Sequence, residues 1–174
     1  ATISGLWSVE DGMELVLARG LAMGGVSVPG AMAALECSES RLLELLQGWD
    51  GLWLATINGP EQVVVSGRLE VLEAWLEAVG GALPRVKRLA VSQAFHTPLM
   101  EEAAAALFAA LAGVRFGEAR IPWVSNVTGE WAGDEVRTAE YWVRQMLSPV
   151  RFGAGLGRLW GEGWRWFLEV GPGA

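Results

Sequence analysis

His96 is the only histidine among the 174 residues, and its side chain is the one best suited to act as a general base. It lies in the run Ser92-Gln93-Ala94-Phe95-His96-Thr97-Pro98, between a strand-like segment and a helix start. Such junctions often border ligand sites in α/β sheets, and a helix N-terminus disfavours the imidazolium form. His96 is therefore either a neutral general base or a structural histidine at the start of a helix.

Arg19 is a second candidate, because it lies on an apolar face of a predicted helix. The residues three and four positions away are all apolar: Leu15, Val16, Ala22 and Met23. A guanidinium in such a stripe either reaches past it to solvent or binds an anion. A carboxylate is the anion that fits its planar fork with two hydrogen bonds. Both interpretations stay open from the residues alone.

The remaining polar candidates are Gln145, in a predicted helix, and Asn126, after a short apolar run, where a turn role is equally suitable. One histidine and one cysteine, Cys37, give no ligand set for a metal. The glycines form neither a phosphate loop nor a dinucleotide fingerprint. The sequence also lacks Gly-x-Ser-x-Gly, so no serine elbow lies within it. We expect no metal and no cofactor bound by this chain.

Composition narrows the class of protein. Apolar residues make up 52% and charged residues 19%, which is typical of a globular chain. The net charge of −7 and the scattered basic residues argue against nucleic-acid binding. A single cysteine allows no intrachain disulfide and indicates a reducing compartment, the cytoplasm. No apolar run reaches the roughly 18 residues that a membrane span needs.

The hydrophobic pattern predicts a β-α-β-β-α-β module within residues 30–92. Strands are expected at 30–37, 52–58, 62–67 and 85–91, with helices at 38–48 and 69–83, the second ending at Gly80-Gly81. This order is the split βαβ, ferredoxin-like arrangement. An RNA-binding module of that type is disfavoured, because the 62–67 strand has no aromatic residue for base stacking.

The flanking segments predict longer helices and two short strands. Helices are expected at 8–24, from Thr97 to about Leu111, at 138–147 and then to about Trp160, and strands at 123–129 and 164–171. The fold class is therefore α/β with an α+β insertion. Residues 1–29 and 93–174 are expected to form one subdomain and residues 30–92 the other.

Motif order extends this interpretation. The motifs, in chain order, are Arg19-Gly20 with Met23, Gly30-Ala31-Met32-Ala33-Ala34, Asn58-Gly59-Pro60 with Val64-Val65-Ser66-Gly67, Ala94-Phe95-His96-Thr97-Pro98-Leu99-Met100, Val124-Ser125-Asn126-Val127-Thr128-Gly129, Trp142-Val143-Arg144-Gln145 with Pro149-Val150-Arg151-Phe152, and Phe167-Leu168-Glu169-Val170-Gly171-Pro172-Gly173. Across nearly the whole chain, this series resembles the acyltransferase domains of modular type I polyketide synthases, relatives of malonyl-CoA:acyl-carrier-protein transacylases.

The resemblance implies a large subdomain of α/β-hydrolase type, here incomplete, with a ferredoxin-like small subdomain. It also implies ping-pong acyl transfer through a serine in a Gly-His-Ser-x-Gly elbow. In the family this elbow lies shortly before the helix that starts near Ser8, so we expect the serine upstream of the first residue. By itself, the chain is then not expected to form an acyl-enzyme.

The resemblance also assigns roles to residues. His96 matches the base, Gln145 matches the position whose backbone carbonyl orients it, and Arg19 matches the arginine that pairs with the carboxylate of malonyl-type units. Phe95, Gln93 and Asn126 complete the expected substrate-binding set. Phe95 favours malonyl-CoA over methylmalonyl-CoA, because its bulk leaves less room for an α-methyl group, whereas Gln93 departs from the His that the malonyl pattern has there.

The expected partners are malonyl-CoA, with methylmalonyl-CoA as the alternative, an acyl carrier protein with its phosphopantetheine arm, and a neighbouring ketosynthase domain. Two other hypotheses stay open. One is a discrete malonyl transacylase of fatty-acid synthesis, and the other is a degenerate, non-catalytic docking domain. An intact Gly-His-Ser-x-Gly upstream favours an enzyme over a docking domain.

Overall fold

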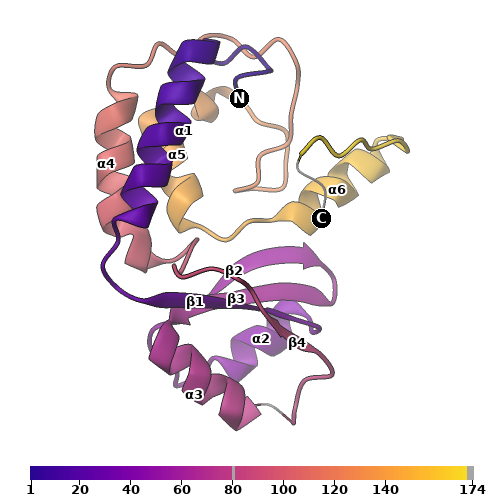
Figure 1. The fold of residues 1–174 in the computed structure, drawn as a ribbon. Helices are drawn as coiled ribbons and strands as arrows, with labels where there is room; N and C mark the ends of the chain where they lie inside the picture. Colours follow the sequence, from indigo (N-terminus) through magenta and orange to yellow (C-terminus); the bar gives the residue numbers. More distant parts are fainter. Residues whose placement is uncertain (80, 172–174) are drawn as a thin grey trace.

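A four-stranded antiparallel sheet lies across the middle of the molecule (Figure 1). The computed structural model describes residues 1–79 and 81–171. The strands are β1 (Gly30–Leu35), β2 (Leu52–Gly59), β3 (Gln62–Arg68) and β4 (Val86–Arg88), in the order β2-β3-β1-β4. The helices α2 (Glu39–Leu45) and α3 (Leu69–Val79) cover one face of this sheet. The order of strands and helices predicted for residues 30–92 is the order observed.

Apolar residues that alternate along the strands build the core under α2 and α3. In β3, Val63 and Val65 point toward the helices, and Val64 points to the opposite face. Trp75 of α3 is fully buried in this core, and its indole Nε1–H donates to the carbonyl of Leu45, 3.0 Å away. The buried members are Ala33, Leu35, Cys37, Leu42, Leu52, Leu54, Val63, Val65, Leu72, Trp75, Val79 and Leu83.

A separate helical half lies beyond the other face of the sheet (Figure 1). It contains α1 (Val9–Gly24), α4 (Glu101–Leu111) and α5 (Ala139–Leu147), with 3₁₀ turns at η1 (Pro98–Met100) and η2 (Asp134–Arg137). Hydroxyl caps start these segments: Ser8 caps α1, Thr97 caps η1 and Thr138 caps α5. Leu15 of α1, Leu107 of α4 and Met146 of α5 meet in a second core.

Two short segments join the helical half to the sheet. Phe95 packs on the free face of the sheet, against the cluster of Met32, Ala55 and Val64. Val150 pairs with β2 through a parallel bridge to Thr56. Its amide donates to the carbonyl of Ala55 at 2.9 Å. The last helix, α6 (Phe152–Gly161), follows this bridge and projects from the body (Figure 1).

Several predicted boundaries differ in the structure. The helix expected from Thr97 begins as the 3₁₀ turn η1, and the strand expected at 85–91 is only Val86–Arg88. The helix expected at 69–83 ends at Val79; the predicted stop at Gly80 lies outside the described residues.

The two short strands expected in the helical half are wrong. Residues 123–129 make one isolated bridge, Val124 to Trp131, within a turn. Residues 164–170 form neither helix nor strand, and Trp166 and Val170 are 94% and 87% exposed. Both segments have the composition of strands, but neither lies beside a strand within the described residues, and a strand needs a hydrogen-bonded neighbour.

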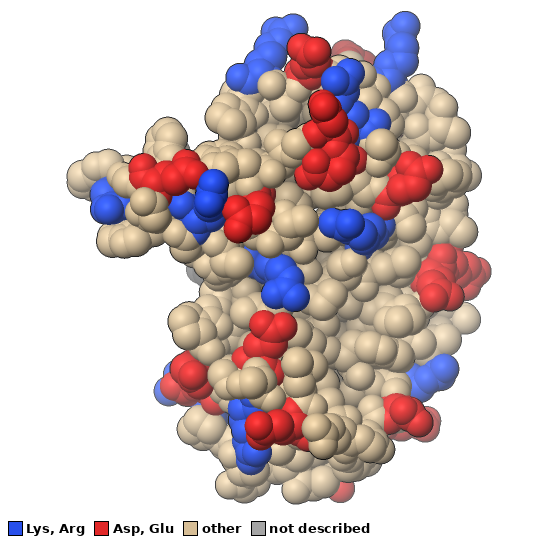
Figure 2. Space-filling model, turned by 180° about the vertical axis from the view of Figure 1, so that it is seen from behind, with Lys and Arg blue, Asp and Glu red and all other residues tan. Residues whose placement is uncertain are grey.

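Acidic and basic side chains are interspersed over the surface seen from behind (Figure 2). Many of them pair across short distances, such as Arg88 with Glu73 at 2.6 Å and Arg158 with Glu162 at 3.1 Å. In the described part of the chain, no helix has the length and apolar character needed to cross a membrane.

Candidate functional site

His96 has a backbone conformation that few side chains adopt. Its φ of 60° makes it the one non-glycine residue with positive φ among residues 1–79 and 81–171. The residue lies between Phe95, packed on the sheet, and Thr97, which is fully buried and caps η1. Left-handed backbone at such a position costs free energy and is common where a side chain has a functional orientation.

The imidazole of His96 is held by the end of α5. Its Nδ1 lies 3.1 Å from the carbonyl oxygen of Ser148. A carbonyl oxygen only accepts, so Nδ1 carries the proton and donates, and Nε2 of the neutral ring keeps its lone pair. The hydrogen bond thus selects the tautomer in which Nε2 can take a proton.

Burial lowers the pKa of His96 below its ordinary value, and the positive charge of Arg19 lowers it further. The backbone carbonyls of Ser148 and Gln145 act on this pKa in the opposite direction. The role expected for the Gln145 carbonyl in orienting His96 stays a prediction, because the hydrogen bond of the imidazole goes to the carbonyl of Ser148. Because the two lowering effects prevail, His96 is neutral at physiological pH.

Arg19 and Gln145 are joined directly, although 126 positions separate them. Nη1 of Arg19 donates to Oε1 of Gln145 at 2.6 Å. Partial burial lowers the pKa of Arg19, although a guanidinium stays charged. No described carboxylate lies within 4.0 Å of Arg19, so its charge has no ionic partner among residues 1–79 and 81–171.

Three of the six predicted site residues line one cavity of about 310 Å³: Arg19, Asn126 and Gln145. Its other walls are Trp123, Val124, Tyr141 and Trp142. A cavity with apolar walls, a lone guanidinium and two amides is suited to a small acid. His96 is not a wall of this cavity, but its contact with the end of α5 places it beside Gln145.

The other two predicted residues lie on the segment that carries His96. Gln93 donates from Nε2 to the carbonyl of Val26 at 3.1 Å and so ties the segment to the loop after α1. Phe95 packs between the free face of the sheet and the helical core. The structure gives Gln93 a backbone contact and Phe95 a packing role next to the base.

Comparison with known proteins identifies the family. The acyl transferase domain family matches residues 1–174. The chain belongs to this family.

The relatives of this acyl transferase chain are much longer proteins. Polyketide synthase GfsA of Streptomyces halstedii is 40% identical over 174 residues, which is 99% of this chain and 2% of that protein. The crystal structure of the acyltransferase domain from the second module of the salinomycin polyketide synthase matches with a TM-score of 0.86 and 34% identity, over 94% of this chain and 38% of that one. Malonyl CoA-acyl carrier protein transacylase from Clostridium perfringens matches with a TM-score of 0.85 and 28% identity, over 93% and 53%.

Sequence reasoning missed the residues that support the cavity wall in this member of the family. The hydroxyls of Ser125 and Tyr141 are buried and lie 2.6 Å apart, and the amide of Val127 donates to Ser125 Oγ. The carbonyl of Asn126 also accepts from the amide of Arg151 at 2.8 Å. These contacts hold the turn that carries Asn126, and only the closeness of Ser125 to Asn126 pointed to them.

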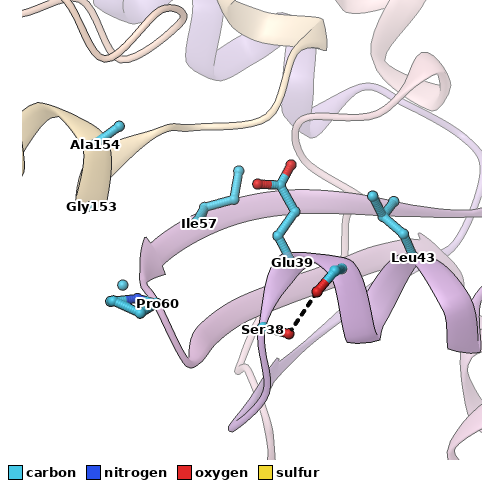
Figure 3. Close-up of a pocket in the computed structure, with 9 residues that line it drawn as sticks. Ser38, Glu39, Leu43, Ile57, Pro60, Gly153 and Ala154 are labelled. Atoms are coloured by element: carbon cyan, nitrogen blue, oxygen red, sulfur yellow. Dashed lines mark hydrogen bonds between the residues drawn. The ribbon is translucent and has the colours of Figure 1, made fainter.

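A larger groove of about 640 Å³ lies between α2, the β2–β3 turn and the start of α6 (Figure 3). Its walls are mostly apolar, and Ser38 and Ser40 hydrogen-bond to each other at 3.0 Å. Its one ionisable wall residue, Glu39, lies 3.8 Å from Arg151. The residues that line the groove include neither a histidine nor a basic side chain, so the smaller cavity and the neighbouring His96 form the candidate site.

The described residues offer no metal site, because no three His, Cys, Asp or Glu side chains gather among residues 1–79 and 81–171. Cys37 is buried in the core of the sheet, where burial raises the pKa of its thiol. A buried thiol with a raised pKa is a poor nucleophile. His96 and Arg19 therefore stay the candidate reactive groups among the described residues.

Proposed function

We propose that this chain belongs to an acyltransferase that moves malonyl units from coenzyme A, through an acyl-serine, to the phosphopantetheine thiol of an acyl carrier protein in polyketide synthesis. The observation that carries the proposal is the neutral His96 imidazole, bonded through Nδ1, next to an Arg19 that has no ionic partner among residues 1–79 and 81–171. The family and the solved transacylase relatives support this chemistry.

In the first half-reaction, His96 Nε2 takes the hydroxyl proton of a serine as its oxygen attacks the thioester carbonyl. The carbon–sulfur bond breaks, and the proton passes to the departing thiolate of coenzyme A. No Gly-x-Ser-x-Gly lies in the 174 residues, so we place this serine in the preceding part of the complete domain.

In the second half-reaction, Nε2 takes the proton of the phosphopantetheine thiol, whose sulfur attacks the acyl-serine ester. The ester carbon–oxygen bond breaks, and the proton returns to the serine oxygen. A base that works in both directions needs a pKa near or below neutrality, which is the direction that burial and Arg19 give His96.

Arg19 is proposed to hold the free carboxylate of the acyl unit. Its side chain lines the 310 Å³ cavity, and with one nitrogen on Gln145 it keeps further N–H groups for an anion. Asn126 on the same wall is a further polar contact for the acyl unit. Phe95, packed beside the base, favours malonyl over methylmalonyl, and Gln93 acts through the segment it anchors.

The subdomain assignment is part of the proposal. The strand order β2-β3-β1-β4 with both helices on one face supports a ferredoxin-like small subdomain over residues 30–92. Residues 1–29 and 93–174 then belong to a large subdomain of hydrolase type. An acyl-CoA substrate and a single cysteine favour the cytoplasm, and a ketosynthase domain is the proposed neighbour.

The test is acyl-enzyme formation by the complete acyltransferase domain with radiolabelled malonyl-CoA, methylmalonyl-CoA and acetyl-CoA. His96→Ala should slow labelling by every acyl-CoA about 10²-fold or more, since general-base catalysis contributes that much. Arg19→Ala should lose the preference for malonyl over acetyl while retaining acetyl labelling.

Arg115→Ala is the matched control, because Arg115 is exposed and lies outside the cavity. It should label like the wild type. Equal labelling of the wild type and His96→Ala, or no labelling of the wild type by any acyl-CoA, is incompatible with the proposed function.

A further inference from the structure

Arg19 is held by a neutral side chain, although a carboxylate is its more common partner in proteins. Among the described residues its one side-chain hydrogen bond goes to Gln145 Oε1 at 2.6 Å, and both partly buried residues line the cavity. An arginine only donates, so the amide oxygen of Gln145 must face it.

A neutral partner has a different effect from an acidic one. A glutamate at position 145 would fix the guanidinium equally well, but it would also compensate the charge and occupy N–H groups that an incoming carboxylate needs. The glutamine fixes one nitrogen and leaves the positive charge uncompensated. A long, flexible side chain is thereby ordered before the ligand arrives, which reduces the entropy lost on binding.

We propose that the side chain of Gln145 is a positioning residue for Arg19, and that it sets the preference for acyl units with a free carboxylate. This inference rests on the proposed function and deepens it. It is separate from the contact between the end of α5 and His96, since that contact uses backbone carbonyls, which every residue type supplies.

This separation makes the two contributions experimentally distinct. Changes to the Gln145 side chain should slow acyl-enzyme formation mainly with acyl units whose carboxylate needs Arg19. They should not remove the backbone contact that holds the base. Acetyl-CoA has no carboxylate but needs the same base, so its labelling rate reports the base and the fold together.

The experiment uses the complete acyltransferase domain with Gln145→Glu and Gln145→Leu, and measures kcat/KM of acyl-enzyme formation for malonyl-CoA and acetyl-CoA. Gln145→Glu should lower the malonyl-to-acetyl ratio about tenfold or more, since it compensates the charge of Arg19. Gln145→Leu should lower it less, because the charge remains and only its orientation is lost. At a pH well above the pKa of His96, acetyl labelling should fall by a smaller factor than malonyl labelling in both variants.

Arg144→Gln is the matched control. It lies on the same helix, is exposed, and changes the net charge by the same amount as Gln145→Glu. It should leave the malonyl-to-acetyl ratio unchanged.

The outcomes separate the two proposals. An unchanged ratio in both Gln145 variants, with a wild type that prefers malonyl, overturns the positioning role and leaves the acyltransferase function standing. A wild type that labels with neither acyl-CoA overturns both. If one variant loses acetyl labelling through misfolding, the ratio in the other decides.

Discussion

At the scale of the residue, the decisive feature is the environment of His96. The imidazole is largely buried, its Nδ1 donates to a backbone carbonyl, and a cation lies nearby. Burial and the nearby positive charge both disfavour the protonated ring. Its backbone has a positive φ, and the buried Thr97 and the packed Phe95 on either side hold it in this conformation. The strain of this residue is thus maintained by its neighbours.

The charge of Arg19 should be visible in the pH dependence of the reaction. Arg19→Met removes a positive charge that disfavours the imidazolium, so the pKa of His96 should rise. Since only the neutral ring acts as a base, the acid limb of kcat/KM for acetyl-CoA should move to higher pH. Acetyl-CoA is the substrate of choice because it makes no use of the guanidinium.

Arg115→Met serves as the control for this profile and should leave the acid limb where it is in the wild type. A limb that stays in place in Arg19→Met, or moves to lower pH, would show that the cation does not act on the base. The measurement needs initial rates over a pH series extending well below the ordinary pKa of histidine.

At the scale of the element, the start of β1 supports the segment that carries His96. Gly30 has no side chain, and a Cβ at this position would overlap the backbone of Ala94 and Gln93. The amide of Gly30 also donates to the carbonyl of Ser92 at 3.2 Å. The close approach of these two backbones therefore fixes where the segment leaves the sheet.

Gly30→Ala should displace the 92–96 segment, because the atoms it meets are backbone and cannot rotate away. We expect a loss of about 1–3 kcal/mol in the free energy of unfolding, and a fall in kcat for both malonyl-CoA and acetyl-CoA. Urea unfolding and the labelling assay measure the two effects.

Gly20→Ala is the control within a helix, since nothing lies within 4 Å of the added Cβ. There the alanine should be neutral or stabilising by up to about 1 kcal/mol. Stability and kcat of Gly30→Ala both equal to those of the wild type would contradict the close packing.

Local signals predicted most elements of this chain. The helices predicted at 8–24 and 138–147 are confirmed, and in the structure the hydroxyls of Ser8 and Thr138 cap their starts within one turn. The segments 123–129 and 164–170 failed for the opposite reason, because a strand depends on a neighbour that composition does not reveal.

The candidate site was predictable only in part, because its contacts join residues that are far apart in the sequence. His96 and Arg19 were notable from their own surroundings in the sequence. The hydrogen bond from Arg19 to Gln145 spans 126 positions, and the contact of His96 with Ser148 spans 52. Only the packing of α1, α4 and α5 brings these groups together.

At the scale of the whole molecule, the two halves have separate cores. The core under α2 and α3 draws all its buried residues from positions 33–83, and the core of the helical half draws its own from both sides of that range. The junction between them includes Phe95 on the free face of the sheet and the bridge from Val150 to Thr56. His96 and Ser148 of the candidate site lie next to these two contacts in the chain.

Trp75→Ala should test the independence of the cores. Trp75 is fully buried, so its truncation should lower the stability of the sheet module by about 3–5 kcal/mol. Amide hydrogen exchange should accelerate in β1 and β3 far more than in α4, because α4 belongs to the other core.

Trp166→Ala is the control, since Trp166 is 94% exposed, and it should change neither region. Equal acceleration of exchange in α4 and in β3 of Trp75→Ala would mean that the halves unfold as one cooperative unit.

The bridge from Val150 to Thr56 has a consequence for how the chain acquires its site during synthesis. The sheet module closes with contacts inside residues 30–92, but the carbonyl that orients His96 sits two residues before Val150. A ribosome must therefore extend the chain more than 50 residues past the histidine before the base can be oriented. Contacts of such long sequence separation form late, so the nascent chain should carry an ordered sheet and an unaligned histidine while the 52 residues from His96 to Ser148 are added.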